Sequence, residues 1–368
     1  MSTPAVTLLV DPGSYHFEND RLFDADSDHM GDHLNAPYAA LRSWMAERGV
    51  PTHTADRLPE VAGAVNVYVS LGMRRRWRSL VDRDDVVLSA FFALECPIVE
   101  PRLYRDLDDL APAFRRLYSY APADALRPFL RRPLTFLPYR IPQAFDRVHE
   151  RLWSQRGRAG TVLVNANKRP RLTTDELYSE RLRAIAALET RGGIDLYGPA
   201  WDGPAYRLGE TRVPATVRRI GRWLETPWDR RRPGAALAAA RRAWRGPTPD
   251  KPATLARYRF CICYENMALP GYVSEKLFDC FFAGTVPVYL GAPDIADWVP
   301  STCYVDRRDF SSYGDLADHL EAMGDAEWQA MRESARDFLA SAAFRPFSTE
   351  AFCQRIADLV QEDTGARP

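Results

Sequence analysis

The sequence predicts an α/β protein of two Rossmann-like lobes with a cleft between them. Its 368 residues exceed what one hydrophobic core usually organises, which predicts two domains of roughly 150 to 200 residues. Strand-like and helix-like segments alternate in both halves, a pattern typical of parallel sheets with helices packed on them. Because ligands of such folds bind beyond the carboxyl ends of the strands, functional residues are expected where predicted strands end.

The first lobe is expected over residues 1–155. Leu41 and Met45 recur at helical spacing and predict a helix at residues 36–48. Short apolar runs around that helix predict strands at residues 6–10, 65–69 and 86–94. The Pro- and Arg-rich stretch at 127–158 contains the expected end of this lobe.

The second lobe is expected over residues 156–345. Leu177 and Ile185 lie on one face of a predicted helix at residues 174–190. Apolar runs predict strands at residues 161–165, 194–198, 258–263 and 286–290. Further helices are predicted at residues 277–283, 325–341 and 349–362. Residues 346–368 are expected to close the chain as a separate helical segment.

The composition is that of a soluble globular protein, with 46% hydrophobic and 27% charged residues. Lys plus Arg and Asp plus Glu both number 49, so there is no net field to attract nucleic acid or acidic lipid. The N-terminal sequence has no basic stretch followed by a long apolar run. We therefore expect a cytoplasmic protein without a membrane segment or a nucleic-acid partner.

Neither cysteines nor acidic clusters predict a metal site. The six cysteines lie mostly in apolar runs, and the Cys261-x-Cys263 spacing is wrong for a zinc knuckle, so reduced core thiols are expected. One polar cluster has metal-ligating residue types: Asp26, Asp28, His29, Asp32 and His33. Its density favours a polar loop on the acceptor side over a metal centre, so no metal is expected.

A polar turn at residues 264–276 is the most informative feature of the chain. It joins a predicted strand to a predicted helix, and a helix N-terminus offers unpaired N–H groups and a partial positive charge to an anion. Lys276 adds a full charge, while Glu275 and Asn266 supply groups suited to sugar or ribose hydroxyls. These residues predict a sugar nucleotide held by its diphosphate.

Lysine usage supports that prediction. Only three of the 49 basic residues are lysines, namely Lys168, Lys251 and Lys276. A compact ammonium and a planar guanidinium bind phosphate differently, so lysines retained in an arginine-rich chain are candidates for specific roles. Chance retention on solvated faces is the alternative. We expect Lys276 and Lys168 to bind the donor, with Lys251 a weaker candidate.

Several motifs in the second half resemble one enzyme family. They are Tyr264-Glu265-Asn266, Gly271-Tyr272-Val273-Ser274-Glu275-Lys276, residues 283–291 and Asp309-Phe310. Their text and spacing resemble the α1,3/4-fucosyltransferases of glycosyltransferase family ten, and shorter similarities lie at 165–201 and 94–97. The resemblance implies a GT-B fold and an inverting, metal-independent transfer of L-fucose from GDP-fucose to a glycan or small-molecule hydroxyl. It implies no cofactor beyond the GDP-sugar donor.

The resemblance also implies roles for individual residues. Carried over by motif, Arg181 and Lys276 grip the diphosphate, and Asn266 lies close to them. Tyr272 and Glu275 contact the fucose and ribose region. An arginine fork suits a phosphate, and fixed cations stabilise the charge that develops on the departing GDP. The alternative for Arg181 is a surface arginine on a helix.

Glu95 is the candidate general base. It follows the apolar run at 86–94 and precedes Pro97, which places a carboxylate at a strand end. Inverting transfer needs a base to take the proton of the attacking hydroxyl, and this segment resembles the base-bearing segment of the family. Glu100 is the rival, and a loop carboxylate capping the helix that begins at Pro101 is the structural alternative.

Two other functions stay open at this stage. Met267 stands where the family commonly has a small hydroxyl residue, and a reshaped sugar pocket would favour another nucleotide sugar in secondary metabolism. A catalytically silent protein that binds nucleotide sugars or glycans is the second alternative.

The use of Arg in place of Lys indicates a bacterium of high GC content.

Overall fold

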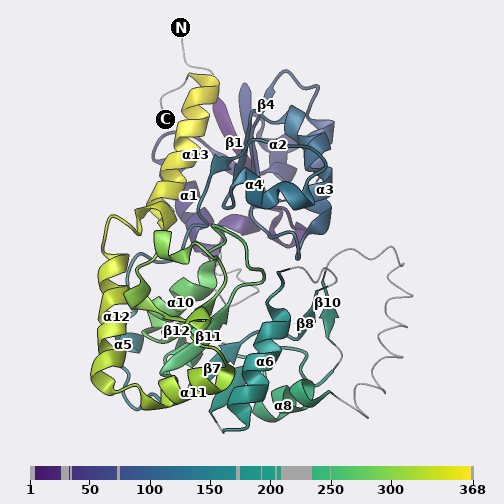
Figure 1. The fold of residues 1–368 in the computed structure, drawn as a ribbon. Coiled ribbons are helices and arrows are strands. Elements are labelled where there is room, and N and C mark those ends of the chain that lie inside the picture. Colours follow the sequence, from purple (N-terminus) through teal and green to yellow (C-terminus); the bar gives the residue numbers. More distant parts are fainter. Residues whose placement is uncertain are drawn as a thin grey trace. The chain divides into compact units, whose positions relative to one another are not determined.

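The protein folds into two compact α/β units (Figure 1). The computed structural model describes residues 5–25, 33, 35–72, 75–170, 175–191, 193–203, 205–208, 234–248 and 250–365. The first unit comprises residues 1–97, 101–146 and 344–368. The second comprises residues 98–100 and 147–343. We describe each unit by itself.

The first unit is built on a parallel sheet with strand order β2-β1-β3-β4-β5-β6. Its strands are β1 (Val6–Asp11), β2 (Thr52–Thr54), β3 (Val65–Ser70), β4 (Val86–Ala93), β5 (Arg116–Ser119) and β6 (Leu137–Pro138). Every residue of β1 is buried, as expected for a strand covered on both faces by helices. The strands predicted at 6–10, 65–69 and 86–94 are therefore confirmed to within a residue.

Helices from both ends of the chain cover this sheet. They are α1 (Ala36–Ala46), α2 (Leu58–Val61), α3 (Pro101–Leu110), α4 (Ala123–Leu126) and α13 (Thr349–Thr364). The C-terminal α13 packs on α1, with the rings of Tyr38 and Phe352 edge to face at 5.6 Å. Phe352 and Ile356 lie in the same buried cluster as Leu8 and Leu41. The end of the chain thus completes the core of the first unit.

The second unit is built on a parallel sheet with strand order β13-β12-β11-β7-β9. Its strands are β7 (Thr161–Val164), β9 (Ile194–Tyr197), β11 (Phe260–Tyr264), β12 (Val286–Leu290) and β13 (Val305–Asp306). A separate ribbon pairs β8 (Lys168–Arg169) with β10 (Tyr206–Arg207). The helices are α5 (Glu150–Trp153), α6 (Tyr178–Glu189), α8 (Ala235–Ala243), α9 (Lys251–Leu255), α10 (Glu275–Ala283), α11 (Tyr313–Ala322) and α12 (Asp325–Leu339).

One predicted helix begins later than expected. The periodicity predicts a helix from residue 174, but α6 begins at Tyr178. The backbone before it pairs instead with the segment after β11, because Leu177 N donates to Asn266 O and Ala268 N donates to Asp175 O. This tertiary pairing outweighs the local helical preference and brings the start of α6 against the polar turn that follows β11.

Both sheets contain a point at which the chain reverses its direction of winding. In the first unit the strands after β1 lie on opposite sides of it, β2 on one side and β3 on the other. In the second unit β9 and β11 flank β7 in the same way. The loops that leave such neighbouring strands diverge, which opens a crevice at their carboxyl ends where ligands bind. The reversal in the second unit therefore lies between β7 and β11.

A ladder of alternating cations and aromatic rings ties α12 to the rest of the second unit. The guanidinium of Arg332 lies 4.3 Å from the ring centroid of Trp153 and 4.5 Å from that of Trp328. Arg336 also lies 4.4 Å from the ring centroid of Trp153, and Arg259 lies 5.1 Å from that of Trp328. Such contacts gain strength when they are desolvated, and Arg332 is buried.

Removing the central ring should destabilise the protein. Trp153→Ala deletes a buried indole and leaves Arg332 without its stacking partner, so we expect a loss of about 3 to 5 kcal/mol in the free energy of unfolding. Chemical denaturation measures the loss, and Val81→Ala, at an exposed apolar position, is the control. A loss below about 1 kcal/mol would show that the ladder is not a stabilising element.

Candidate nucleotide-sugar site

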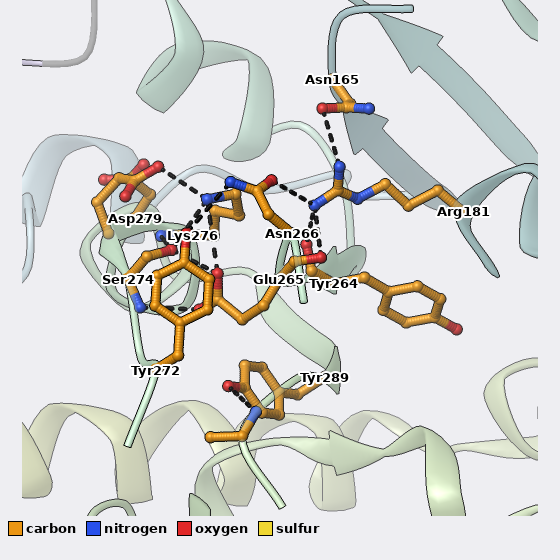
Figure 2. A network of polar contacts seen from close by, with 12 residues as sticks. Asn165, Arg181, Tyr264, Glu265, Asn266, Tyr272, Ser274, Lys276, Asp279 and Tyr289 are labelled. Atoms are coloured by element: carbon orange, nitrogen blue, oxygen red, sulfur yellow. Dashed lines mark hydrogen bonds and ion pairs between the residues drawn. The ribbon is translucent and has the colours of Figure 1, made fainter. Parts of the chain in front are cut away.

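The candidate site lies at the carboxyl ends of β7 and β11, where the second sheet reverses. Asn165 directly follows β7, and Glu265 and Asn266 directly follow β11. Figure 2 shows the side chains of Asn165, Arg181, Asn266, Tyr272 and Lys276 in one network of polar contacts. The residues predicted from the polar turn are thus brought together with Arg181, from α6.

Arg181 is buried, with 3% of its surface exposed, and is therefore not a surface arginine of α6. Its Nη2 donates to the carbonyl oxygens of Tyr264 at 2.5 Å and Glu265 at 2.7 Å, and to Asn266 Oδ1 at 3.1 Å. Its Nη1 donates to Asn165 Oδ1 at 3.3 Å (Figure 2). One guanidinium therefore joins the ends of both strands.

The loop after Asn266 is held at two points. Asn266 Nδ2 donates to Tyr272 Oη at 3.2 Å, which orients the buried tyrosine toward the strand end. Gly271, with φ at 72°, donates its N–H to Asp294 Oδ1 at 2.8 Å. A positive φ is readily adopted only by glycine, so this turn depends on that residue. Met267 is buried.

Glu265 and Ser274 anchor the start of α10. Ser274 is the N-cap and donates both its N–H and its hydroxyl to the Glu265 carboxylate, at 2.8 and 2.6 Å. Lys276 Nζ donates to Ser274 Oγ at 2.9 Å and lies 3.5 Å from Glu265 Oε2. Glu265 is fully buried. The lysine is therefore fixed by the same residues that cap its helix.

Charges around Lys276 set the protonation states of the site. Burial alone would raise the pKa of Glu275, but the charges of Lys276 and Lys251 outweigh it and lower this pKa to about 2. Burial alone would lower the pKa of Lys276, but Glu275 and Glu265 outweigh it and raise this pKa above its ordinary value. Lys251 pairs with Asp279 at 2.7 Å. The site therefore presents a fixed ammonium and a fixed carboxylate at neutral pH.

Two predicted residues lie outside this network of the second unit. Lys168 is exposed on the β8–β10 ribbon. Glu95 belongs to the first unit, where it is exposed in the turn after β4 and its carbonyl accepts a hydrogen bond from Tyr104 Oη at 2.6 Å. Burial raises the pKa of the rival Glu100.

Sequence reasoning did not assign roles to several residues of the site. Glu265 and Ser274 stand within the motif text, which gave them no individual role. Asn165 directly follows β7, at the edge where ligand-binding residues are expected, and that position is the signal that could have identified it.

A search of the described residues for metal and membrane features finds neither. No group of three or more His, Cys, Asp or Glu side chains is arranged there to hold a metal ion. Of the polar cluster, His33 is described and packs against Phe145 at 5.3 Å, while residues 26, 28, 29 and 32 lie outside the described ranges. None of the described helices is long and apolar enough to cross a membrane.

The low pKa of Glu275 predicts how stability depends on pH. A carboxylate with a lowered pKa contributes stability above its unfolded-state value of about 4.3, and that contribution is lost as the pH falls toward about 2. Glu275→Gln should therefore cost at most about 3 kcal/mol at neutral pH and flatten the acid limb of the stability profile. Denaturant unfolding between pH 7 and 2.5 measures this, with the exposed Glu321→Gln as control. An unchanged acid limb would contradict the assignment.

Similarity to known proteins agrees with this geometry. Residues 236–364 match the profile of glycosyltransferase family 10 (fucosyltransferase), C-terminal part. An alpha-(1,4)-fucosyltransferase of Arabidopsis thaliana is 38% identical over 71 residues, which are 19% of this chain and 18% of the relative. GDP-fucose protein O-fucosyltransferase 3 of Bos taurus is 39% identical over 82 residues, which are 22% of this chain and 17% of the relative. The chain thus spans a fifth or less of the length of the curated relatives it matches.

The fold has a solved counterpart. The crystal structure of an alpha1,3-fucosyltransferase superposes with a TM-score of 0.51 at 12% identity, covering 99% of this chain and 91% of that one. This likeness confirms the predicted GT-B class, two Rossmann-like units each with a parallel sheet. The resemblance read from the motifs is likewise confirmed, because residues 236–364 match the model of the C-terminal part of glycosyltransferase family 10 (fucosyltransferase).

Proposed function

We propose that this protein is an inverting glycosyltransferase that moves L-fucose, or a related sugar, from a GDP-sugar to a hydroxyl of a glycan or small-molecule acceptor. The observation that carries the proposal is the placement of Lys276. This ammonium lies at the N-terminus of α10, at the carboxyl edge where the second sheet reverses, within a network that contains Asn266 and Arg181. The relatives named above support fucose as the sugar and GDP as its carrier.

A fixed cation suits this reaction because the leaving group gains negative charge. Transfer breaks the bond between the sugar C1 and a phosphate oxygen, and the electron pair leaves with GDP. The Lys276 side chain is 24% exposed, so part of its surface remains open to a phosphate. Its charge, with the N–H groups of α10 and the nearby Arg181, would stabilise the diphosphate without a metal ion. The proposal includes Lys168 as an outer donor contact.

The neighbouring polar groups suit the sugar and ribose. Glu275 is ionised throughout the neutral range because its pKa is about 2, and its side chain is 29% exposed. An exposed carboxylate accepts hydrogen bonds from ribose or fucose hydroxyls. The hydrogen bond between Asn266 and Tyr272 places an amide and a phenol beside it.

Glu95 completes the proposed reaction. An acceptor hydroxyl attacks C1 from the face opposite the phosphate, its proton passes to the Glu95 carboxylate, and the product has the inverted configuration. The exposure of Glu95 at the carboxyl edge of the first sheet supports this role. The proposal extends to a bacterial, cytoplasmic enzyme, as expected from the composition, with no nucleic-acid partner.

Nucleotide binding tests the donor site. GDP at a hundredfold its dissociation constant should raise the free energy of unfolding by roughly 2.7 kcal/mol, while UDP and ADP should give much smaller shifts. Lys276→Ala should abolish the stabilisation by GDP. Thermal-shift measurements report both, and Arg183→Ala, an exposed position on α6, is the matched control. Unchanged GDP binding in Lys276→Ala would refute the site, and a preference for UDP would refute the donor class.

Transfer assays test the base. Glu95→Gln should lower kcat for transfer to an acceptor panel by about 10²- to 10⁴-fold while GDP still stabilises the protein. Glu100→Gln serves as the matched variant and should transfer at nearly the wild-type rate. A loss confined to Glu100→Gln would move the role to that residue. Donor hydrolysis, scored as free GDP, separates loss of transfer from loss of donor binding.

A further inference from the structure

Glu265 is a buried carboxylate that the proposed reaction does not use. None of its surface is exposed, so its side chain cannot reach a ligand in solvent. A buried ionised carboxylate is costly unless hydrogen bonds and an opposite charge compensate for its lost hydration. Its partners therefore show why the fold keeps it.

The backbone and the side chain of Glu265 contact opposite sides of the site. Its carbonyl accepts from Arg181 Nη2 at 2.7 Å, and its N–H donates to Leu290 O at 2.8 Å, which extends the pairing of β11 with β12. Its carboxylate accepts from Ser274 N and Oγ and lies 3.5 Å from Lys276 Nζ. One residue thus links both cations proposed for the diphosphate (Figure 2).

The surroundings of Glu265 leave its side chain little freedom to move. A Cβ added at Gly291 would lie 2.5 Å from Glu265 Cγ and 2.4 Å from Tyr289 Oη, so the strand end is packed directly against the carboxylate stem. Tyr289 Oη in turn accepts from Ala292 N at 3.0 Å. The carboxylate is therefore clamped between this packing and the cap of α10.

We propose that Glu265 is a positioning residue for the diphosphate site: it fixes Lys276 and the N-terminus of α10 in place relative to Arg181 without touching the ligand. The proposal rests on the function proposed above. It goes further because it assigns the orientation of the essential ammonium to a residue outside the reach of the substrate.

A simpler role would be to hold the loop, and the chain offers a matched control for it. Asp294 also binds this loop, since its carboxylate accepts from Gly271 N at 2.8 Å and from Trp298 Nε1 at 3.1 Å. Glu275, Glu265, Arg181 and Lys251 are the charged groups that act most strongly on the pKa of Lys276, whereas the Asp294 carboxylate binds Gly271 and Trp298. Asp294→Asn therefore perturbs the loop without changing the charge beside Lys276.

The first experiment measures the chemical reactivity of Lys276. The protein has three lysines, so labelling with acetic anhydride followed by mass spectrometry resolves each one. Glu265→Gln removes a negative neighbour, which favours the neutral amine, and should raise the labelling rate of Lys276 at fixed pH about tenfold. Asp294→Asn should leave that rate unchanged, and the exposed Lys168 is the internal standard.

The second experiment measures the affinity for GDP. Glu265→Gln should weaken GDP binding, measured by calorimetry, about tenfold, whereas Asp294→Asn should weaken it less than about threefold. Glu265→Asp keeps the charge, but its side chain is shorter by one methylene. It should therefore change the labelling rate and the GDP affinity in the same directions as Glu265→Gln, by smaller factors. It also replaces Glu265→Gln should that variant not fold.

The outcomes are separable. Equal losses in Glu265→Gln and Asp294→Asn would reduce Glu265 to a loop anchor and overturn the proposal. Lys276 labelling and GDP affinity that stay at wild-type values in the Glu265 variants would also overturn it. A wild-type protein that binds no GDP would refute the proposed function, while the labelling rates would still decide whether Glu265 governs Lys276.

Discussion

The structure of the site depends on the divergence of the chain between β7 and β11. Parallel strands leave their carbonyl ends unpaired at one edge, and where the winding reverses no crossover covers them. Arg181 compensates for this by donating to the carbonyls of Tyr264, the last residue of β11, and of Glu265, which follows it. The same guanidinium that completes the sheet thereby brings a buried positive charge to the place where a ligand can enter. If the proposed function holds, one side chain serves both the stability of the fold and the binding of the diphosphate.

The helix that begins at this edge carries a charge that is unfavourable by itself. A cation in the first turn of a helix opposes the helix dipole, typically by 0.3 to 1 kcal/mol. Lys276 is the second residue of α10, and it is accommodated because Glu275 precedes it and Glu265 lies below it. At the other end Gly284 adopts the left-handed conformation, and Arg158 donates to Ala283 O at 2.9 Å, a favourable place for a cation.

Much of this could be predicted from the sequence, and the failures have a common cause. The strands at 86–94 and 286–290 and the motif residues Asn266, Tyr272 and Lys276 stand in local patterns of apolar periodicity and polar turns. The start of α6 was predicted too early because its preceding backbone pairs with Asn266 and Ala268, a contact between segments distant in sequence. The role of Glu265 was missed for the same reason: its burial and its contacts with Ser274 are set by how β11, β12 and α10 pack.

The charge pattern around α10 also explains why an anion suits this site better than a neutral ligand. The first turn contains Lys276, and the two carboxylates beside the lysine differ in exposure, Glu265 being fully buried and the Glu275 side chain 29% exposed. A phosphate bound as proposed would meet the exposed part of the Lys276 side chain and could exchange with Glu275, whereas Glu265 is buried beyond its reach. The buried carboxylate therefore keeps the lysine charged and oriented in both states. In the proposed function, a nucleotide diphosphate would exchange with the exposed Glu275 while Glu265 stays in place, so it could bind and leave without a rearrangement of the site.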